Sequence, residues 1–136
     1  MNTFSLKVIG CTKIFFDGQC ESLVIPSDDG MRGILAGHEN CVMVVETGEM
    51  VIKTPDNKEI HAFVGEGALE VINGDVNVLV ISVERPEDID EVRAEEAKER
   101  AEEALRQHQS IKEYYHSKAS MARAMERLKV KKKYDQ

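Results

Sequence analysis

The chain has 136 residues, a length typical of one domain with an appendage, and 42% of them are hydrophobic, enough to form a core. Its net charge of −7 argues against a general nucleic-acid-binding protein. The longest apolar runs, 41–45 and 78–81, are far shorter than the roughly 20 residues that cross a bilayer, so any membrane association is expected to go through partners. Three cysteines without a Cys-x-x-Cys spacing predict neither a disulfide framework nor a zinc site, and they favour a reducing cytosol.

The first 85 residues have the pattern of short strands separated by turns. Residues 4–8 alternate apolar and polar side chains with a period of two, as a half-buried strand does. Asp17-Gly18 predicts a hairpin turn between strands at 12–16 and 20–25, and residues 31–41 are expected to form a loop. Further strands are expected at 41–45, 49–53, 59–64, 68–72 and 76–83, with a turn at Asn73-Gly74 between the last two. This spacing predicts a flattened β-sandwich or barrel over residues 1–85.

The pattern changes at Pro86, after which there is no glycine or proline. Pro86 predicts the first turn of a helix, with acidic residues at the positive end of the helix dipole. Small residues then recur at spacings of three and four, which suits close packing of two helices; they are Ala94, Ala97, Ala101 and Ala104. A turn is expected at 107–110, with Ser110 capping a second helix. Residues 86–136 are therefore predicted to form an antiparallel two-helix hairpin, which makes the fold class α+β.

The second helix carries two candidate stripes and most of the basic charge. A stripe of Tyr115, Ala119 and Ala122 is expected to face the first helix, while Met121, Met125 and Leu128 need another surface. Residues 107–136 hold 8 Lys and Arg against 3 Asp and Glu, a balance of +5, whereas residues 87–106 hold 4 against 9, a balance of −5. A basic segment in an acidic protein suits docking on an acidic partner or on phosphate.

Two arginines of the second helix indicate an anion site. Arg123 and Arg127 are four apart and share a helix face, where two like charges repel unless an anion lies between them. Guanidinium groups match phosphate oxygens, and Arg93 adds a third cation if the helices are antiparallel. Asp90 and Glu84 could then accept hydrogen bonds from a base or ribose. On spacing alone, ordinary surface arginines on a solvated hairpin remain the simpler alternative.

Several segments, in order and spacing, resemble the epsilon subunit of bacterial F-type ATP synthase over essentially the whole chain. They include Phe16-Asp17-Gly18, "GILAGH" from Gly33, "GALEVINGDVNVLV" from Gly67, "IDEVRA" from Ile89 and "RAMERLKV" from Arg123. The chain departs from the family pattern at Met31, Ala36, Glu66 and Ala68. "IDEVRA" and the later Arg-x-x-x-Arg are the two halves of the motif with which some members bind ATP.

The resemblance implies a non-catalytic rotor subunit, without catalytic residues, metal or obligatory cofactor. The sandwich would bind the gamma subunit and the c-subunit ring, with Met31, Gly33 and His38 as candidate interface residues. The hairpin would permit ATP hydrolysis when folded and inhibit it when extended against the alpha/beta catalytic head. ATP would be a regulatory ligand of the folded hairpin, held by Glu84, Asp90, Arg93, Arg123 and Arg127. The implied location is the cytoplasmic face of the bacterial cell membrane, peripheral and reached through the complex, with no nucleic-acid partner.

Two other classes of protein remain open on the residues alone. One is a β-sandwich adaptor whose hairpin binds a partner helix without nucleotide; in it, Asp90 and the three arginines need not converge. The other is a small nucleotide-binding enzyme, which is the poorest fit because no nucleophile, base or metal-ligand set accompanies the arginines.

Overall fold

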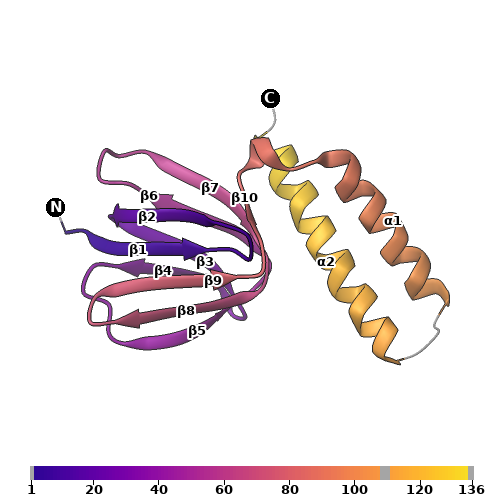
Figure 1. Cartoon of the computed structure of the whole chain (residues 1–136), viewed down its shortest axis with the longest axis horizontal. Coiled ribbons are helices and arrows are strands. Elements are labelled where there is room, and N and C mark those ends of the chain that lie inside the picture. The colour runs from indigo at the N-terminus through magenta and orange to yellow at the C-terminus, as the bar shows by residue number, and fades with distance from the viewer. Residues whose placement is uncertain (1, 108–110, 135–136) are drawn as a thin grey trace. The chain divides into compact units, whose positions relative to one another are not determined.

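The computed structural model describes residues 2–107 and 111–134, and the chain divides into two compact units, Met1–Arg85 and Pro86–Gln136. The first unit is a β-sandwich and the second is a pair of antiparallel helices (Figure 1). The predicted α+β fold class is therefore confirmed.

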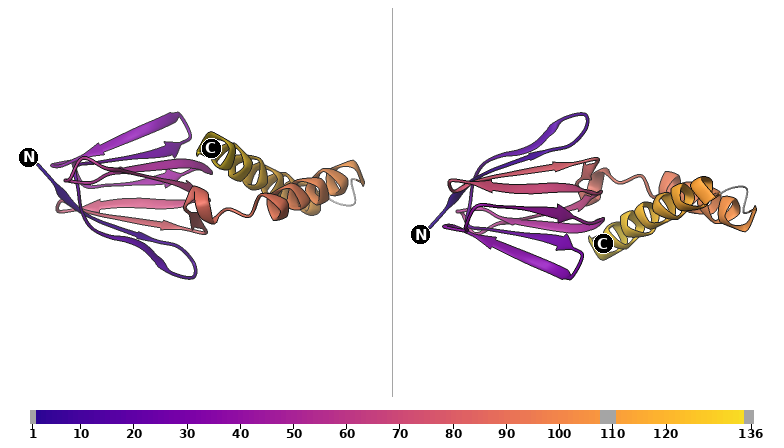
Figure 2. Two further views of the ribbon diagram at one scale, coloured as in Figure 1. Left: turned by 90° about the horizontal axis from the view of Figure 1, so that it is seen from above. Right: turned by 90° about the horizontal axis from the view of Figure 1, so that it is seen from below.

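The sandwich consists of two five-stranded sheets, seen as two layers in Figure 2. One sheet has the order β2-β1-β9-β8-β5. Its strands are β1 (Phe4–Ile9), β2 (Ile14–Cys20), β5 (Cys41–Val45), β8 (Gly67–Ile72) and β9 (Asp75–Val80). The other sheet has the order β10-β7-β6-β3-β4. Its strands are β3 (Ser22–Ser27), β4 (Gly30–Leu35), β6 (Gly48–Lys53), β7 (Glu59–Val64) and β10 (Val83–Glu84).

The core lies between the two sheets and follows the alternation of the sequence. In β1, Phe4, Leu6 and Val8 point inward and are buried, while the residues between them are half-exposed. Strand β6 alternates in the same way, with Met50 and Ile52 fully buried. Because successive side chains of a strand point to opposite faces, this alternation also fixes which residues line the outer face of each sheet.

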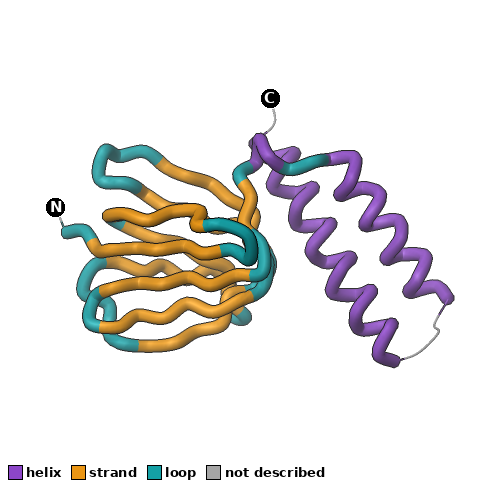
Figure 3. Tube along the Cα trace, in the orientation of Figure 1, coloured by secondary structure: helices purple, strands orange, loops and turns teal. Residues whose placement is uncertain are grey.

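Three sequence predictions within the sandwich are wrong. The strand expected at 76–83 ends at Val80, and Val83–Glu84 form β10 in the other sheet. Asp17 and Gly18 do not form a turn; they lie inside β2 and pair with Lys7 and Leu6 of β1. The chain reverses earlier, where the Gly10 N–H donates to the Lys13 carbonyl at 2.9 Å. Residues 30–35, expected largely as loop, form strand β4 at the sheet edge (Figure 3). Within β4 only Ile34 is buried, so the strand lacks the alternation by which it could have been recognised.

The predicted Asn73-Gly74 turn is correct. Asn73 has φ 51° and Gly74 φ 86°, and Ile72 pairs with Asp75 across the turn. Two residues with positive φ give the tight hairpin that joins twisted antiparallel strands.

The hairpin unit contains a short 3-10 turn, η1 (Pro86–Asp88), followed by α1 (Glu91–Gln107) and α2 (Ile111–Tyr134). Pro86 was expected to open the helix, but it opens η1 instead, and η1 packs against α2. The α1 helix begins only after Asp90. The predicted turn residues 108–110, including the Ser110 cap, lie outside the described residues.

The packing stripe of α2 differs from the predicted one. Tyr115 and Ala122 are exposed, whereas Ser117, Ala124 and Leu128 are buried. These three follow one another at spacings of seven and four, which also keeps residues on one helix face. Counting only alanines and large apolar side chains in the sequence misses Ser117, which is a buried polar residue of this stripe.

Replacement of Gly67 by alanine is expected to destabilise the sandwich by about 3 kcal/mol or more. A Cβ at Gly67 would meet the Leu79 carbonyl oxygen at 2.0 Å and the Val80 Cα at 2.7 Å. Both are backbone atoms of the paired strand β9, so the sheet itself must shift. Urea unfolding followed by circular dichroism measures the change, with Gly33→Ala as control because a Cβ there meets nothing within 4 Å. Equal unfolding midpoints for the two variants would contradict the close approach of β8 and β9.

Candidate functional site in the helical hairpin

Asp90 is the N-cap of α1. Its Oδ1 accepts a hydrogen bond from the Arg93 backbone N–H at 3.1 Å, and its carbonyl accepts one from the Ala94 N–H at 3.0 Å. A capping carboxylate satisfies an otherwise unpaired backbone donor and lies at the positive end of the helix dipole. The Arg93 side chain is exposed in the first turn. The start of α1 therefore carries one capping carboxylate and one exposed guanidinium.

Arg123 and Arg127 are both half-buried on α2. The Arg123 Nη2 donates to the Ser120 Oγ one turn earlier at 3.1 Å, which orients that guanidinium along the helix. Their spacing of four residues keeps them on one face, as the sequence predicts.

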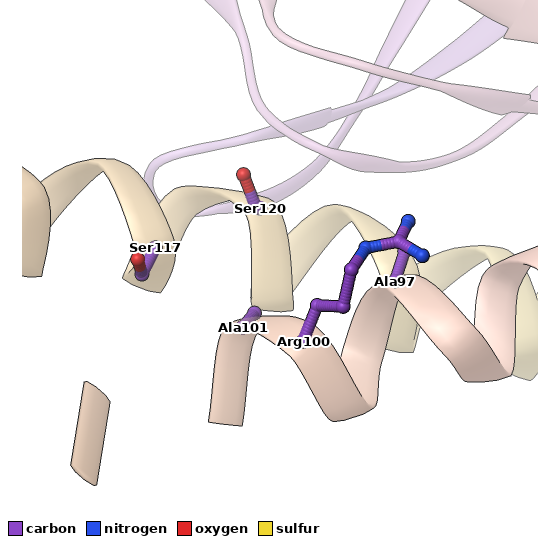
Figure 4. A pocket seen from close by; sticks show the side chains of 5 residues that line it. All are labelled: Ala97, Arg100, Ala101, Ser117 and Ser120. Atoms are coloured by element: carbon purple, nitrogen blue, oxygen red, sulfur yellow. The ribbon is translucent and has the colours of Figure 1, made fainter. Parts of the chain in front are cut away.

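A small cavity between the helices shows how they are aligned. It is lined by Ala97, Arg100 and Ala101 from α1 and by Ser117 and Ser120 from α2 (Figure 4). Because the helices run antiparallel, one turn from Ala97 towards the start of α1 reaches Arg93, and one turn from Ser120 towards the end of α2 reaches Arg123. The turns that carry Arg93 and Arg123 thus lie at a common level of the hairpin, and Arg127 follows one turn later on α2.

The cavity itself has a volume of about 230 Å³, below the range of roughly 300–1,000 Å³ in which small-molecule sites usually fall. It is an open depression that fits part of a ligand rather than a whole nucleotide. Arg100, Ser117 and Ser120 are polar residues of this region that were not among the predicted site residues. Arg100 could have been found, because it follows Arg93 by seven residues and therefore lies on the same helix face.

Glu84 belongs to the other unit. It is the last residue of β10, where it pairs with Phe63 of β7, and it is half-buried. The structure thus places Asp90, Arg93, Arg123 and Arg127 in the helical unit and Glu84 in the sandwich. Whether the five side chains share one ligand remains a prediction.

The three predicted interface residues lie along and just after β4. Met31 and Gly33 are exposed and two residues apart, so they share one face of this edge strand with Leu35, which is 64% exposed. His38 lies in the turn after β4, where its backbone N–H donates to the Leu35 carbonyl at 3.3 Å.

A second exposed apolar surface, absent from the sequence predictions, crosses the outer face of the β2-β1-β9-β8-β5 sheet. Directly paired residues form a row across all five strands: Ile14, Ile9, Leu79, Ala68 and Val44. Val44 is 60%, Ile14 55% and Leu79 50% exposed. We call these five residues the apolar row. Contiguous exposed apolar side chains on a soluble domain typically mark an interaction site. Each of the five strands shows its apolar residue in the sequence, but only the strand pairing shows that these residues lie in one row.

Within residues 2–107 and 111–134, no group of three or more His, Cys, Asp or Glu side chains is placed to hold a metal ion. The same part of the chain has no helix that is long and apolar enough to cross a membrane.

Comparison with known proteins agrees with this architecture. The family described as ATP synthase, Delta/Epsilon chain, beta-sandwich domain matches residues 3–86, and its long alpha-helix domain matches residues 87–132. The ATP synthase epsilon chain of Ruminiclostridium cellulolyticum is 41% identical over 94% of this chain and 95% of the relative. The epsilon chain of Caldanaerobacter subterraneus subsp. tengcongensis is 38% identical over 98% and 97%.

Among solved structures, a chain of the Euglena gracilis mitochondrial ATP synthase has the same fold, with a TM-score of 0.78 and 18% identity over 92% of this chain and 79% of that one. A chain from the Tetrahymena thermophila mitochondrial ATP synthase central stalk and c-ring gives a TM-score of 0.70 at 14% identity, over 93% and 95%. Together with the family matches over both units, this shows that the chain belongs to the ATP synthase delta/epsilon chain family.

Proposed function

We propose that the chain is a non-catalytic central-stalk subunit of a bacterial F-type ATP synthase, peripheral on the cytoplasmic face of the cell membrane. Its sandwich binds the gamma subunit and rests on the c-subunit ring, and in this way it helps couple ion flow to ATP synthesis. Its hairpin inhibits ATP hydrolysis when extended against the alpha/beta head. The family relationship supports the stalk assignment, and the apolar row supports docking on a partner.

The apolar row is the observation that carries the docking proposal. It spans the outer face of one sheet with three large side chains that are at least half exposed. Beside it runs a polar row in which the Asn77 amide donates to the Glu70 carboxylate at 3.4 Å. An apolar strip flanked by polar groups is the usual anatomy of a protein interface. We assign this face to the gamma subunit, and the exposed face of β4 with Met31 and Gly33 to the ring side.

We further propose that the hairpin binds ATP as a regulatory ligand. Arg93, Arg123 and Arg127 hold the phosphates, while Asp90 and Glu84 contact the adenosine end. The common level of the arginine-bearing turns supports this proposal, since it brings cations from both helices to one stretch of the hairpin. In a β-sandwich adaptor, which is the alternative class, no such arrangement is required.

The docking proposal is tested by co-purification of the tagged chain with the membrane ATPase complex. Leu79→Glu is expected to lower recovery of the complex by about tenfold or more, because a desolvated and unpaired carboxylate costs at least about 2 kcal/mol. Ile72→Glu is the matched control, because Ile72 is also 50% exposed but lies away from the row, beside the Asn73-Gly74 turn.

Recovery of the whole complex with Leu79→Glu would show that the apolar row is not the docking face. Failure of the unsubstituted chain to recover any membrane ATPase subunit would favour the adaptor.

A further inference from the structure

Ser120 carries a hydroxyl that bonds one of the predicted arginines. Its Oγ accepts a hydrogen bond from the Arg123 Nη2 at 3.1 Å, and both side chains are half-buried. The two residues are three apart, so they lie on neighbouring turns of one face of α2. Ser120 also lines the cavity between the helices, together with Ser117 one turn earlier (Figure 4). The bond therefore directs the Arg123 guanidinium back by one turn, to the level of that cavity.

Helix stability alone does not favour a serine at this position. Serine is a weaker helix former than alanine, which occupies positions 119, 122 and 124 of the same helix. A serine hydroxyl inside a helix commonly bonds the carbonyl of the preceding turn, and that interaction slightly weakens the helix. In α2 the Ser120 oxygen accepts from a side chain of the following turn. What the hydroxyl adds to the helix is thus an acceptor for Arg123.

The acceptor matters because a second arginine is close to Arg123. Arg127 follows four residues later on the same face and is also half-buried, and like charges at this spacing repel each other. A long side chain also loses conformational entropy when a ligand fixes it. A hydroxyl that holds one guanidinium reduces both costs. Because a guanidinium carries five N–H donors, one that bonds a hydroxyl can also bond a phosphate.

We propose that Ser120 is a positioning residue of the nucleotide site in the hairpin. Its hydroxyl holds the Arg123 guanidinium beside the cavity before ATP arrives, and Arg123 then contacts a phosphate of ATP. The inference rests on the proposed ATP site, because Arg123 is assigned there to the phosphates. Ser120 acts through Arg123, and its effect is on affinity, since a group that is already in place loses less freedom on binding.

Calorimetric titration of the full chain with ATP tests this role. Ser120→Ala is expected to weaken ATP binding by about fivefold, the factor that corresponds to one typical net hydrogen bond. Ser120→Thr keeps a hydroxyl on Cβ and should bind ATP nearly as the unsubstituted chain does. Ser120→Val has the shape of threonine without the hydroxyl, so it should lose as much affinity as Ser120→Ala.

The same variants distinguish positioning from a structural role. Alanine favours a helix more than serine does, so Ser120→Ala should leave the thermal unfolding midpoint of the chain unchanged or raise it. Weaker ATP binding in a chain that is at least as stable cannot result from a loosened helix. Threonine and valine have similar helix propensities, so the difference in affinity between Ser120→Thr and Ser120→Val reports the hydroxyl alone.

A double-variant cycle tests whether Ser120 acts through Arg123. In an Arg123→Ala background, Ser120→Ala should cause no further loss of affinity, whereas a separate contact between Ser120 and ATP would cost its own factor again. A further loss in that background would overturn the proposal. So would a Ser120→Ala chain that binds ATP as tightly as the unsubstituted one, or a Ser120→Thr chain that binds as weakly as Ser120→Val. Those results leave the ATP site standing, whereas an unsubstituted chain that binds no ATP would overturn the site and the role of Ser120 together.

Discussion

Replacement of Arg127 by alanine is expected to weaken ATP binding to the isolated chain by about ten- to a hundredfold. Charge-assisted hydrogen bonds contribute about 1.5–3 kcal/mol each, and every 1.4 kcal/mol is roughly a factor of ten. Arg93→Ala and Arg123→Ala should act similarly, because the three guanidinium groups are proposed to share one phosphate chain. For the same reason the unsubstituted chain should bind ATP more tightly than AMP.

Calorimetry on matched variants measures these effects. Arg106→Ala is the control, because Arg106 lies in the last turn of α1, at the opposite end of the helix from Arg93, and pairs with Glu103 at 2.8 Å. Asp90→Asn separates two roles of Asp90: asparagine caps a helix as well as aspartate does, but it removes the charge. A loss of affinity in Asp90→Asn with unchanged helix content would therefore identify a ligand contact.

Arg106→Ala weakening ATP binding as much as Arg127→Ala would mean that the arginines act through general charge rather than through a site. Absence of heat at millimolar ATP in the unsubstituted chain would remove the sensor role. The stalk assignment does not depend on that result, because it rests on the family relationship of both units.

Short sequence patterns predicted those parts of the fold that depend on a single physical requirement, such as burial of one strand face or a positive φ in a turn. The alternation in β1 follows from burial of Leu6 and Val8 on one face, and the Asn73-Gly74 turn follows from two positive φ angles. Asp17-Gly18 carries the same kind of turn signal, yet pairing with β1 extends the strand through it. A turn dipeptide shows that a reversal is allowed, whereas the pairing with other strands determines whether it occurs.

The candidate site was predictable as a set of residues but not as a shape. A spacing of four places Arg123 and Arg127 on one face of any helix, so their relation could be derived from the sequence. The involvement of Ser120 and Arg100 depends on which residues of α1 lie opposite which residues of α2, and repeating alanines permit several alignments. The apolar row illustrates the same limit, because its five members come from five strands and only the register brings them into line.

Removal of the chain from residue 87 onward is expected to raise ATP hydrolysis by the assembled complex about fivefold or more, the lower range of typical allosteric coupling. The sandwich forms its own compact unit with its own core and should still dock, while the hairpin that is proposed to inhibit hydrolysis is lost. The increase should be largest at low ATP, because ATP is proposed to hold the hairpin in its folded state and a ligand shifts an equilibrium by its differential affinity. Hydrolysis is measured on purified complexes matched for subunit content.

A charge-reversal pair tests whether the hairpin docks through its basic end. Lys129 and Lys132 are exposed cations in the last turns of α2. The double variant Lys129→Glu, Lys132→Glu should repel an acidic docking surface and so reproduce part of the rise in ATP hydrolysis that is expected on truncation. Lys58→Glu, in the exposed turn between β6 and β7, is the control and should leave hydrolysis unchanged.

If truncation leaves hydrolysis unaltered across ATP concentrations while the sandwich is retained in the complex, the hairpin of this protein is not an inhibitor. If truncation activates but the lysine reversals do not, the hairpin inhibits through contacts other than its basic end.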